Sequence, residues 1–293
     1  MQNNRNANLT RAKQAKNDEY YTLLEDIEKE MQVYLDYDPD VLRGKTVLCP
    51  CDNPDWSNFT KYFTDNFHRL GLKRLISTCI AANGDRHGKV LIMDTGGVQR
   101  GVLQGTGDFR SEEIREYRDQ ADVIVTNPPF SLLRAFVSWI MEAGKQFLIV
   151  GNLNTIAASP VIFPYILQNE IRLGKTFNGK AACFRSPYSD DVIKIGNCCW
   201  VTNLPRFNNP PMQLNTTSGN DLQHYDNFDA VEVAAVKSIP AAYQGAMGVP
   251  ITFLYKHSPE QFDLLSTQWH CMLNGHNVYQ RIIIRRHPAT SSN

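Results

Sequence analysis

The sequence has no excess of positive or negative charge, because its 293 residues contain 30 Lys and Arg against 30 Asp and Glu. This balance excludes a uniformly basic or acidic protein. Local patches rather than the total decide electrostatic docking, so neither nucleic-acid nor small-molecule partners are excluded. With 42% apolar residues the chain is too hydrophobic to be disordered throughout. These values predict one large globular domain, or one domain with a sizeable appendage.

The sequence also lacks a cysteine spacing that is typical of disulfide frameworks or zinc sites. The seven cysteines stand at positions 49, 51, 79, 183, 198, 199 and 271, and none forms a Cys-x-x-Cys motif. This spacing gives no disulfide framework and no zinc ribbon, so we expect reduced thiols and no metal site. The sequence has no apolar run as long as a membrane span, and its polar first residues lack the apolar core of a signal peptide. We therefore expect a cytoplasmic protein.

Strand-like and helix-like segments alternate through the first half of the chain. Short apolar runs predict strands at 46–49, 72–82, 121–126 and 145–152. Helical periodicity predicts helices at about 19–34, 57–71, 111–120 and 131–144. Two apolar runs divided by a Gly-rich turn predict a hairpin at 88–105. The alternation predicts an α/β fold with a Rossmann-like, doubly wound, mostly parallel sheet.

Beyond residue 170 the alternation gives way to short strand-like pieces and turns. The pieces lie at 198–204, 229–236, 249–256 and 280–286. The polar stretch 205–220 is too long for an ordinary connection. It is expected to be either a disordered surface loop or an insertion that contacts the substrate, and the surface loop is favoured.

The strand at 121–126 leads into an unusual segment, Asn127, Pro128, Pro129 and Phe130. Proline fixes its own backbone and holds the preceding residue extended, so this segment is stiff. The Asn127 side-chain oxygen and the Pro128 carbonyl can both accept hydrogen bonds from one NH₂ group, and Phe130 offers a ring face for stacking. Such a clamp would direct the lone pair of a ring-conjugated amine toward an electrophile, by positioning and electrostatics.

The sequence carries its own control for this interpretation. Asn209, Pro210 and Pro211 repeat the tripeptide, but they follow no apolar strand and precede no aromatic residue. Asn-Pro-Pro also occurs as a plain turn former, and we predict no catalytic role for this second copy.

The clamp and two further motifs resemble the S-adenosylmethionine-dependent N6-adenine DNA methyltransferases, and among these the EcoRI-type modification methylases. The further motifs are Gly107-Asp108-Phe109 and the Asn-Asp-Glu-Tyr-Tyr-Thr stretch at 17–22, and the likeness runs over most of the chain to 281–286. The resemblance implies S-adenosylmethionine as cofactor and double-stranded DNA as substrate, with an adenine flipped out of the duplex. It implies no membrane partner, and a cognate restriction endonuclease only as a genetic partner.

The resemblance also implies a role for each part of the chain. Residues 1–40 would close the cofactor site, 41–175 would form the cofactor-binding core, and 176–293 would supply remaining core strands and target recognition. Asn127, Pro128, Pro129 and Phe130 would hold the adenine. The residues implied to bind the cofactor are Tyr20, Tyr21, Thr22, Pro50, Cys51, Asp52, Ser57, Phe59, Thr78, Asp108 and Phe109.

The cofactor loop departs from the family pattern. Cys49 stands where the family has an acidic residue, and residues 53–56 replace its glycines, so Asp52 is expected to take over the contact to the methionine ammonium. The second strand ends without the acidic residue that would hold the ribose, and Asp94 on the hairpin is a weak substitute.

Basic and amide side chains are the candidates for contacting DNA, since Lys and Arg bind phosphates and Arg and Asn read base edges. They are Arg11, Lys13, Lys16, Arg206, Asn208, Asn209, Arg281, Arg285 and Arg286. Three alternatives remain open at this point. RNA adenines and protein glutamines also present an NH₂ group, and the altered cofactor loop is compatible with a relative that binds DNA without methylating it.

Overall fold

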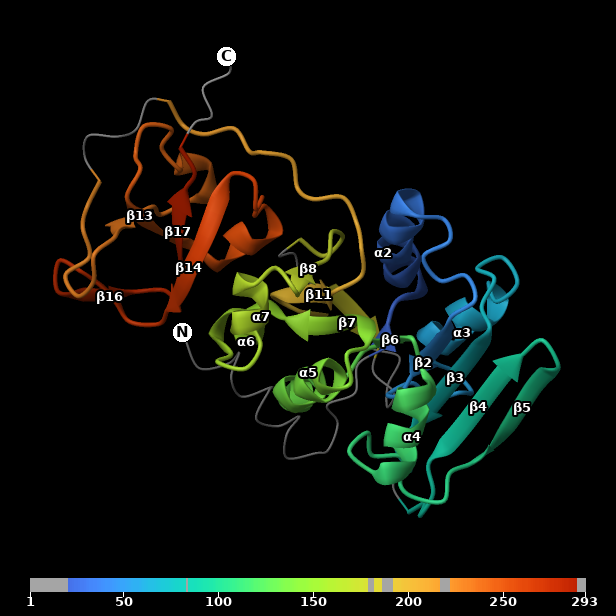
Figure 1. Cartoon of the computed structure of the whole chain (residues 1–293). Coiled ribbons are helices and arrows are strands. Elements are labelled where there is room, and N and C mark those ends of the chain that lie inside the picture. The colour runs from blue at the N-terminus through green and yellow to red at the C-terminus, as the bar shows by residue number, and fades with distance from the viewer. Residues whose placement is uncertain (1–20, 83, 179–181, 186–191, 217–221, 289–293) are drawn as a thin grey trace. The chain divides into compact units, whose positions relative to one another are not determined.

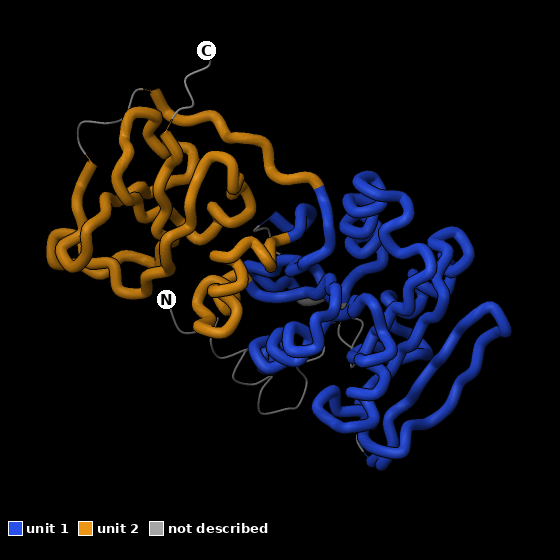
Figure 2. Tube along the Cα trace, viewed as in Figure 1, with its two compact units in different colours: residues 1–152, 174–206 blue, residues 153–173, 207–293 orange. Residues whose placement is uncertain are grey.

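The computed structural model describes residues 21–82, 84–178, 182–185, 192–216 and 222–288. The chain forms two compact units, coloured separately in Figure 2. Unit 1 comprises residues 1–152 and 174–206, and unit 2 comprises residues 153–173 and 207–293. The resemblance implied boundaries at residues 40 and 175. The compact units are divided differently, because the N-terminal helix is part of unit 1 and the segment 153–173 is part of unit 2.

The main sheet of unit 1 has the strand order β5-β4-β3-β2-β6-β7-β11 (Figure 1). Its parallel centre consists of β3 (Arg74–Cys79), β2 (Thr46–Cys49), β6 (Val123–Thr126) and β7 (Gln146–Asn152). The antiparallel strands are β4 (Lys89–Asp94), β5 (Gly97–Val102) and β11 (Cys198–Thr202). The mostly parallel α/β sheet and the hairpin predicted from the sequence are confirmed.

The position of β2 matters for function. It lies between β3, which follows it in the chain, and β6, which comes much later. The strand order therefore reverses at β2. Open α/β sheets bind ligands at such a switch point, beyond the carboxyl ends of the strands.

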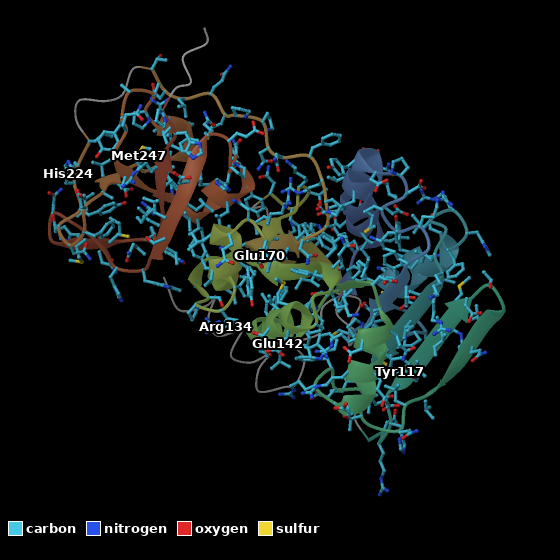
Figure 3. The ribbon with its side chains drawn as sticks, in the orientation of Figure 1. Tyr117, Arg134, Glu142, Glu170, His224 and Met247 are labelled. Carbon is cyan, nitrogen blue, oxygen red and sulfur yellow. The ribbon has the colours of Figure 1, made fainter. Side chains whose placement is uncertain are left out.

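Helices cover the sheet of unit 1. They are α2 (Leu24–Tyr37), α3 (Asn58–Asp65), α4 (Glu112–Gln120) and α5 (Leu133–Glu142), with the 3₁₀ turn η1 (Phe130–Leu132) before α5. One core cluster joins α2 and α3 to alternate strand residues such as Val47 and Val125. The intervening residues, such as Leu48 and Ile124, point to the opposite face because successive strand side chains alternate. Figure 3 shows Arg134 and Glu142 on the exposed face of α5.

Two predicted helices are shorter in the structure than their periodicity suggested. The first begins at Leu24 rather than Glu19, because Tyr21 and Thr22 form the short strand β1, which pairs with β9 (Ala182–Arg185). Beside β9 lies β10 (Val192–Ile195). The second, α3, ends at Asp65 rather than near Gly71. Its start agrees with the expectation, because the Ser57 hydroxyl accepts a hydrogen bond from the backbone N–H of Phe59, as an N-cap residue does.

Unit 2 is built around a four-stranded sheet with the order β12-β13-β17-β14 (Figure 1). Its strands are β12 (Val231–Glu232), β13 (Ala246–Pro250), β17 (Arg281–Arg286) and β14 (Phe262–Gln268), and the hairpin β15 (Cys271–Leu273) to β16 (His276–Val278) continues from β14 and β17. Also in this unit are α6 (Leu153–Ala158), α7 (Phe163–Leu167), β8 (Arg172–Leu173), η2 (Val236–Ser238) and η3 (Ile251–Tyr255). The strand expected at 249–256 is therefore wrong beyond Pro250, where a 3₁₀ helix takes over.

The long polar stretch has no helix or strand between residues 205 and 214, but hydrogen bonds tie it to unit 2. The Asn209 side chain donates to the carbonyls of Tyr255 and His257, at 3.0 and 2.9 Å. Met212 exchanges two hydrogen bonds with the Gln261 side chain. In the part of the chain that the structure describes, no helix combines the length and apolarity needed to cross a membrane.

Candidate functional site

Asp52 is the central residue of the site, in the turn directly after β2. It is only 6% exposed. Its carboxylate accepts a hydrogen bond from the Ser57 hydroxyl at 2.6 Å and another from the Thr126 hydroxyl at 2.5 Å. Ser57 is the N-cap residue of α3, and Thr126 is the last residue of β6 and the immediate neighbour of Asn127. One carboxylate therefore connects the expected cofactor turn to the expected clamp.

Cys49 cannot replace the acidic residue that the family pattern has at its position. Burial raises the pKa of this fully buried thiol well above its ordinary value, and the nearby Asp52 carboxylate raises it further. The thiol therefore stays neutral. Asp52 supplies the carboxyl group at this end of β2, and each of its oxygens can accept more than one hydrogen bond.

The turn that replaces the glycine-rich loop is held by the β4–β5 hairpin. Arg100 donates to the carbonyl of Pro54 and to the Asp55 carboxylate, both at 3.1 Å, and Lys89 donates to the same carboxylate at 2.6 Å. These contacts lower the pKa of Asp55, mainly through the hydrogen bond from Lys89. The inserted hairpin thus fixes residues 54 and 55 in a loop that has no glycines.

The N-terminal motif reaches the same region through β1. The Thr22 carbonyl accepts a 2.8 Å hydrogen bond from the side chain of Asn58, the first residue of α3. Thr22 also pairs with Phe184 of β9, whose ring packs edge-on against Phe130 with centroids 6.3 Å apart. The structure therefore brings Thr22, the start of α3 and the clamp together. Tyr20 lies outside the described residues, and of Tyr21 only the backbone is described.

The clamp occupies the turn between β6 and η1. Asn127, Pro129 and Phe130 are half-buried and Pro128 is buried. The carbonyl of Pro129 accepts from the N–H of Leu132 at 2.9 Å, which closes the turn into α5. This places the asparagine at the carboxyl end of β6, beside the switch point at β2.

Asp108 and Phe109 follow a glycine that the packing requires. Gly107 has a φ of +81°, and a Cβ atom there would lie 2.3 Å from the carbonyl oxygen of Cys79 at the end of β3. Phe109 is 4% exposed and packs edge-on against Phe136 and Trp139. The loop that carries Asp108 is thereby fixed against the end of β3.

The Asp108 carboxylate accepts two side-chain hydrogen bonds from Arg110, at 2.9 and 2.5 Å. These bonds hold the pKa of Asp108 below its usual value. The group is therefore ionised and acts only as a hydrogen-bond acceptor, which suits contact with an amine.

The remaining cofactor candidates are Thr78, Pro50, Phe59 and Cys51. Thr78 is fully buried and donates to the carbonyl of Pro50, itself buried, at 3.3 Å. Phe59 is 2% exposed and packs against Trp200, while Cys51 is partly exposed in the turn. The expectation that Asp94 could replace the acidic residue that holds the ribose is wrong. Because β4 runs antiparallel to β3, Asp94 pairs with Arg74 at the amino end of β3, away from the ligand edge.

The candidates for DNA contact are placed differently from one another. Arg281 is 8% exposed and forms an ion pair with Glu232, so its side chain is not available to contact DNA. The Asn209 side chain donates hydrogen bonds to the carbonyls of Tyr255 and His257. Asn208 is exposed and accepts from Arg172, and Arg206 is only 7% exposed in unit 1. Arg285 is exposed and Arg286 is half-buried at the end of β17. Arg11, Lys13 and Lys16 lie outside the described residues.

Sequence reasoning missed two features of the site and one hairpin of unit 2. Thr126 was read only as the end of a strand, and Asn58 only as part of a helix. Asn274-Gly275 is the two-residue turn of the β15–β16 hairpin, with both residues at positive φ (51° and 74°). An Asn-Gly pair is a strong signal for a two-residue hairpin turn, so this last feature could have been found from the sequence.

Comparison with known proteins agrees with this geometry. Residues 8–290 match the family model described as adenine-specific methyltransferase EcoRI. The chain is 37% identical to the type II methyltransferase M.EcoRI of Escherichia coli, covering 94% of this chain and 95% of that protein. It is also 37% identical to M.MpnI of Mycoplasma pneumoniae and 35% identical to M.MgeORF184P of Mycoplasma genitalium, with 91% of this chain and 86% of each relative covered. No solved structure matches. The chain belongs to the EcoRI family of adenine-specific DNA methyltransferases.

Proposed function

We propose that this enzyme transfers a methyl group from S-adenosylmethionine to the N6 amine of an adenine flipped out of duplex DNA, within a specific sequence. The observation that carries the proposal is the double hydrogen bond of Asp52, which couples the turn after β2 to the residue preceding Asn127. Two reactants must be held within a few tenths of an ångström of the right geometry, because misplacement is costly in rate. A shared carboxylate supplies such a coupling.

Thr22 supports the fit of the cofactor to this site. Its hydroxyl oxygen is buried and has no hydrogen-bond partner among the residues that the structure describes. A buried polar group without a partner is unfavourable, so a ligand that supplies the missing hydrogen bond is favoured. When bound, S-adenosylmethionine supplies an electrophilic methyl group on a sulfonium centre.

Thr22→Val tests this fit, because valine keeps the shape and removes the hydroxyl. We expect the free energy of unfolding to stay the same or rise, since an unsatisfied hydroxyl is lost. The dissociation constant for S-adenosylmethionine, measured by calorimetry, should rise by roughly 10-fold, the value of one good hydrogen bond. Thr22→Ser is the control and should bind the cofactor nearly as well as the wild-type protein. Equal binding by the valine variant would remove Thr22 from the cofactor site.

The chain's own residues act on the adenine. The Asn127 side-chain oxygen and the Pro128 carbonyl accept from the two hydrogens of the N6 amine, and the ring of Phe130 stacks on the base. These acceptors favour the amine geometry in which the lone pair points at the electrophile. N6 is engaged in base pairing inside a duplex, so the base must first leave the stack, at a cost of a few kcal/mol.

An acceptor assay separates this function from its alternatives. The protein is incubated with methyl-labelled S-adenosylmethionine and, in separate reactions, with duplex DNA, RNA and protein. We expect label in N6-methyladenine of duplex DNA, and sequencing the genomic DNA of an expressing host should give the recognition sequence. Label in RNA or in glutamine would favour the other amine substrates. Cofactor binding that is undetectable by calorimetry would indicate a DNA-binding relative that has lost catalysis.

A further inference from the structure

Two exposed aromatic residues lie on the β-ribbon of unit 2 that continues from β14 and β17 into the β15–β16 hairpin. The pairing of β14 with β17 ends at Gln268 opposite Arg281, and the pairing of β15 with β16 begins at Cys271 opposite Val278. Between these pairs the ribbon has Trp269 and His270 on one strand and Tyr279 and Gln280 on the other. In this register Trp269 lies opposite Gln280 and Tyr279 lies opposite His270, so the two aromatic residues occupy neighbouring levels on opposite strands of the ribbon.

These side chains are exposed to an unusual degree for their size. Trp269 is 52% exposed and Tyr279 is 84% exposed. Buried aromatic side chains contribute strongly to stability, and these two contribute little in this way. Large aromatic side chains that one element leaves exposed are candidates for an interaction site.

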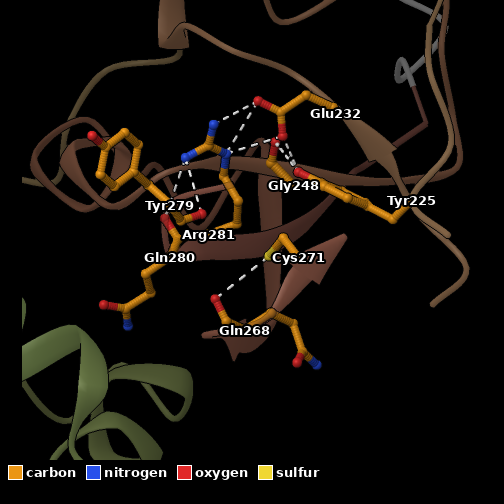
Figure 4. Close-up of polar contacts among 8 residues, drawn as sticks. All are labelled: Tyr225, Glu232, Gly248, Gln268, Cys271, Tyr279, Gln280 and Arg281. Carbon is orange, nitrogen blue, oxygen red and sulfur yellow. Dashed lines mark hydrogen bonds and ion pairs between the residues drawn. The ribbon is translucent and has the colours of Figure 1, made fainter. Parts of the chain in front are cut away.

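A buried ion pair holds the backbone that carries Tyr279 (Figure 4). The Arg281 guanidinium donates to the Glu232 carboxylate at 2.6 Å, and both side chains are 10% exposed. The same guanidinium donates to the carbonyls of Tyr279 and Gln280, at 3.2 and 3.4 Å. The Glu232 carboxylate also accepts from the Tyr225 hydroxyl. A network of this kind fixes the position of a short exposed segment.

The opposite strand is held by two neighbouring side chains. Asn227 donates to the carbonyl of His270 at 2.8 Å and accepts from the N–H of Met272 at 3.0 Å. The Asp226 carboxylate accepts from the N–H of Gly275 in the hairpin turn at 2.8 Å. The exposed side chains thus project from a backbone that is fixed on both strands.

The tip of the ribbon is polar. Asn274, His276 and Asn277 are exposed. A two-stranded β-ribbon fits the major groove of B-DNA, and asparagine can pair with the N6 and N7 atoms of adenine there. The ribbon therefore has polar groups suited to base edges at its tip and aromatic faces suited to stacking at its base.

We propose that the β15–β16 ribbon is a DNA-contacting element of this enzyme, in which the rings of Trp269 and Tyr279 stack on nucleotides of the target DNA. The inference rests on the proposed function, because it takes duplex DNA as the substrate. Base–aromatic stacking tolerates different bases, so these two residues supply affinity and hold deformed DNA, and the polar tip contributes to the choice of sequence.

The test uses the full-length protein and a duplex oligonucleotide that contains the recognition sequence. Trp269→Ala and Tyr279→Ala should each raise the dissociation constant for DNA by roughly 5- to 100-fold, measured by fluorescence anisotropy with S-adenosylhomocysteine present. Trp269→Phe and Tyr279→Phe keep a ring and should stay within about twofold of the wild type. The matched control is Leu265→Ala, which removes an apolar side chain of β14 that is 37% exposed and should leave binding unchanged.

Two further readouts separate stacking from other roles. The slope of log Kd against log salt should be the same in the alanine variants as in the wild type, because no phosphate contact is lost. DNA should quench part of the tryptophan fluorescence of the wild type, and Trp269→Phe, which keeps the fold, should abolish that part. Cofactor affinity should not change in any variant.

Two results would overturn the inference. Alanine variants that bind DNA like the wild type would do so, as would unchanged quenching in Trp269→Phe. If the wild type methylates duplex DNA in either case, only the role of the ribbon falls. If the wild type binds S-adenosylmethionine but no duplex DNA, the proposed function falls as well.

Discussion

Replacing Asn127 with alanine is expected to reduce methyl transfer by at least about 100-fold, the effect of removing one preorganised hydrogen-bonding group from an active site. The substitution removes the side-chain acceptor at the end of β6 and leaves Thr126 and its hydrogen bond to Asp52 in place. The turn that we assign to the cofactor therefore stays intact. We expect the dissociation constant for S-adenosylmethionine to be unchanged by calorimetry, while N6-methyladenine formation on duplex DNA nearly disappears.

The chain offers a matched control for this substitution. Asn209 precedes two prolines as Asn127 does, but its side chain donates to the carbonyls of Tyr255 and His257 in unit 2. Asn209→Ala should cost about 1–2 kcal/mol of stability through these two bonds. The turnover rate of the folded variant should stay close to that of the wild type. Near-normal methylation by Asn127→Ala, or an equal loss in both variants, would contradict the assignment of the clamp.

The largest expected loss of stability follows from Glu232→Ala. The substitution leaves the Arg281 guanidinium with its charge uncompensated in a site where the side chain is 10% exposed. Removing one partner of a buried ion pair typically costs about 3–5 kcal/mol. Tyr225 also loses the acceptor of its hydroxyl. We expect the free energy of unfolding of unit 2 to fall by this amount, measured by urea denaturation with circular dichroism.

The double variant Glu232→Met with Arg281→Met separates the charge from the packing. Replacing both partners of a buried pair by apolar residues is often neutral. The double variant should therefore be more stable than Glu232→Ala. Because it loses the hydrogen bonds that hold the carbonyls of Tyr279 and Gln280, its affinity for DNA should still fall. A double variant as unstable as the single one would show that packing, rather than the charge, makes Glu232 important.

Local features of the sequence predicted much of unit 1. Short apolar runs between turn residues gave the four central strands, and helical periodicity gave the helices that begin at Asn58 and Glu112. These signals act over a few residues, so they are visible without the fold. The segment 127–130 was identified in the same way, from its stiffness and its position after a strand.

Predictions failed where distant residues determine the local structure. The first helix begins late because Tyr21 and Thr22 pair with a strand more than 160 residues away. Asp94 on the hairpin was considered as a weak substitute for the ribose contact, but the antiparallel return of β4 carries it to the amino end of β3. Arg281 was predicted to contact DNA because it is basic, and its burial against Glu232 was not visible in the sequence.

The sequence by itself determined the alternation of strands and helices, the stiff acceptor-rich segment after β6, and the family, because each depends on residues that are adjacent in the chain. Only the tertiary structure decided which charges are available to a ligand. Asp52 meets Thr126 across 74 positions and Arg281 meets Glu232 across 49. Contacts across such separations depend on how the strands are ordered and paired. That order cannot be read from the local patterns of a single sequence.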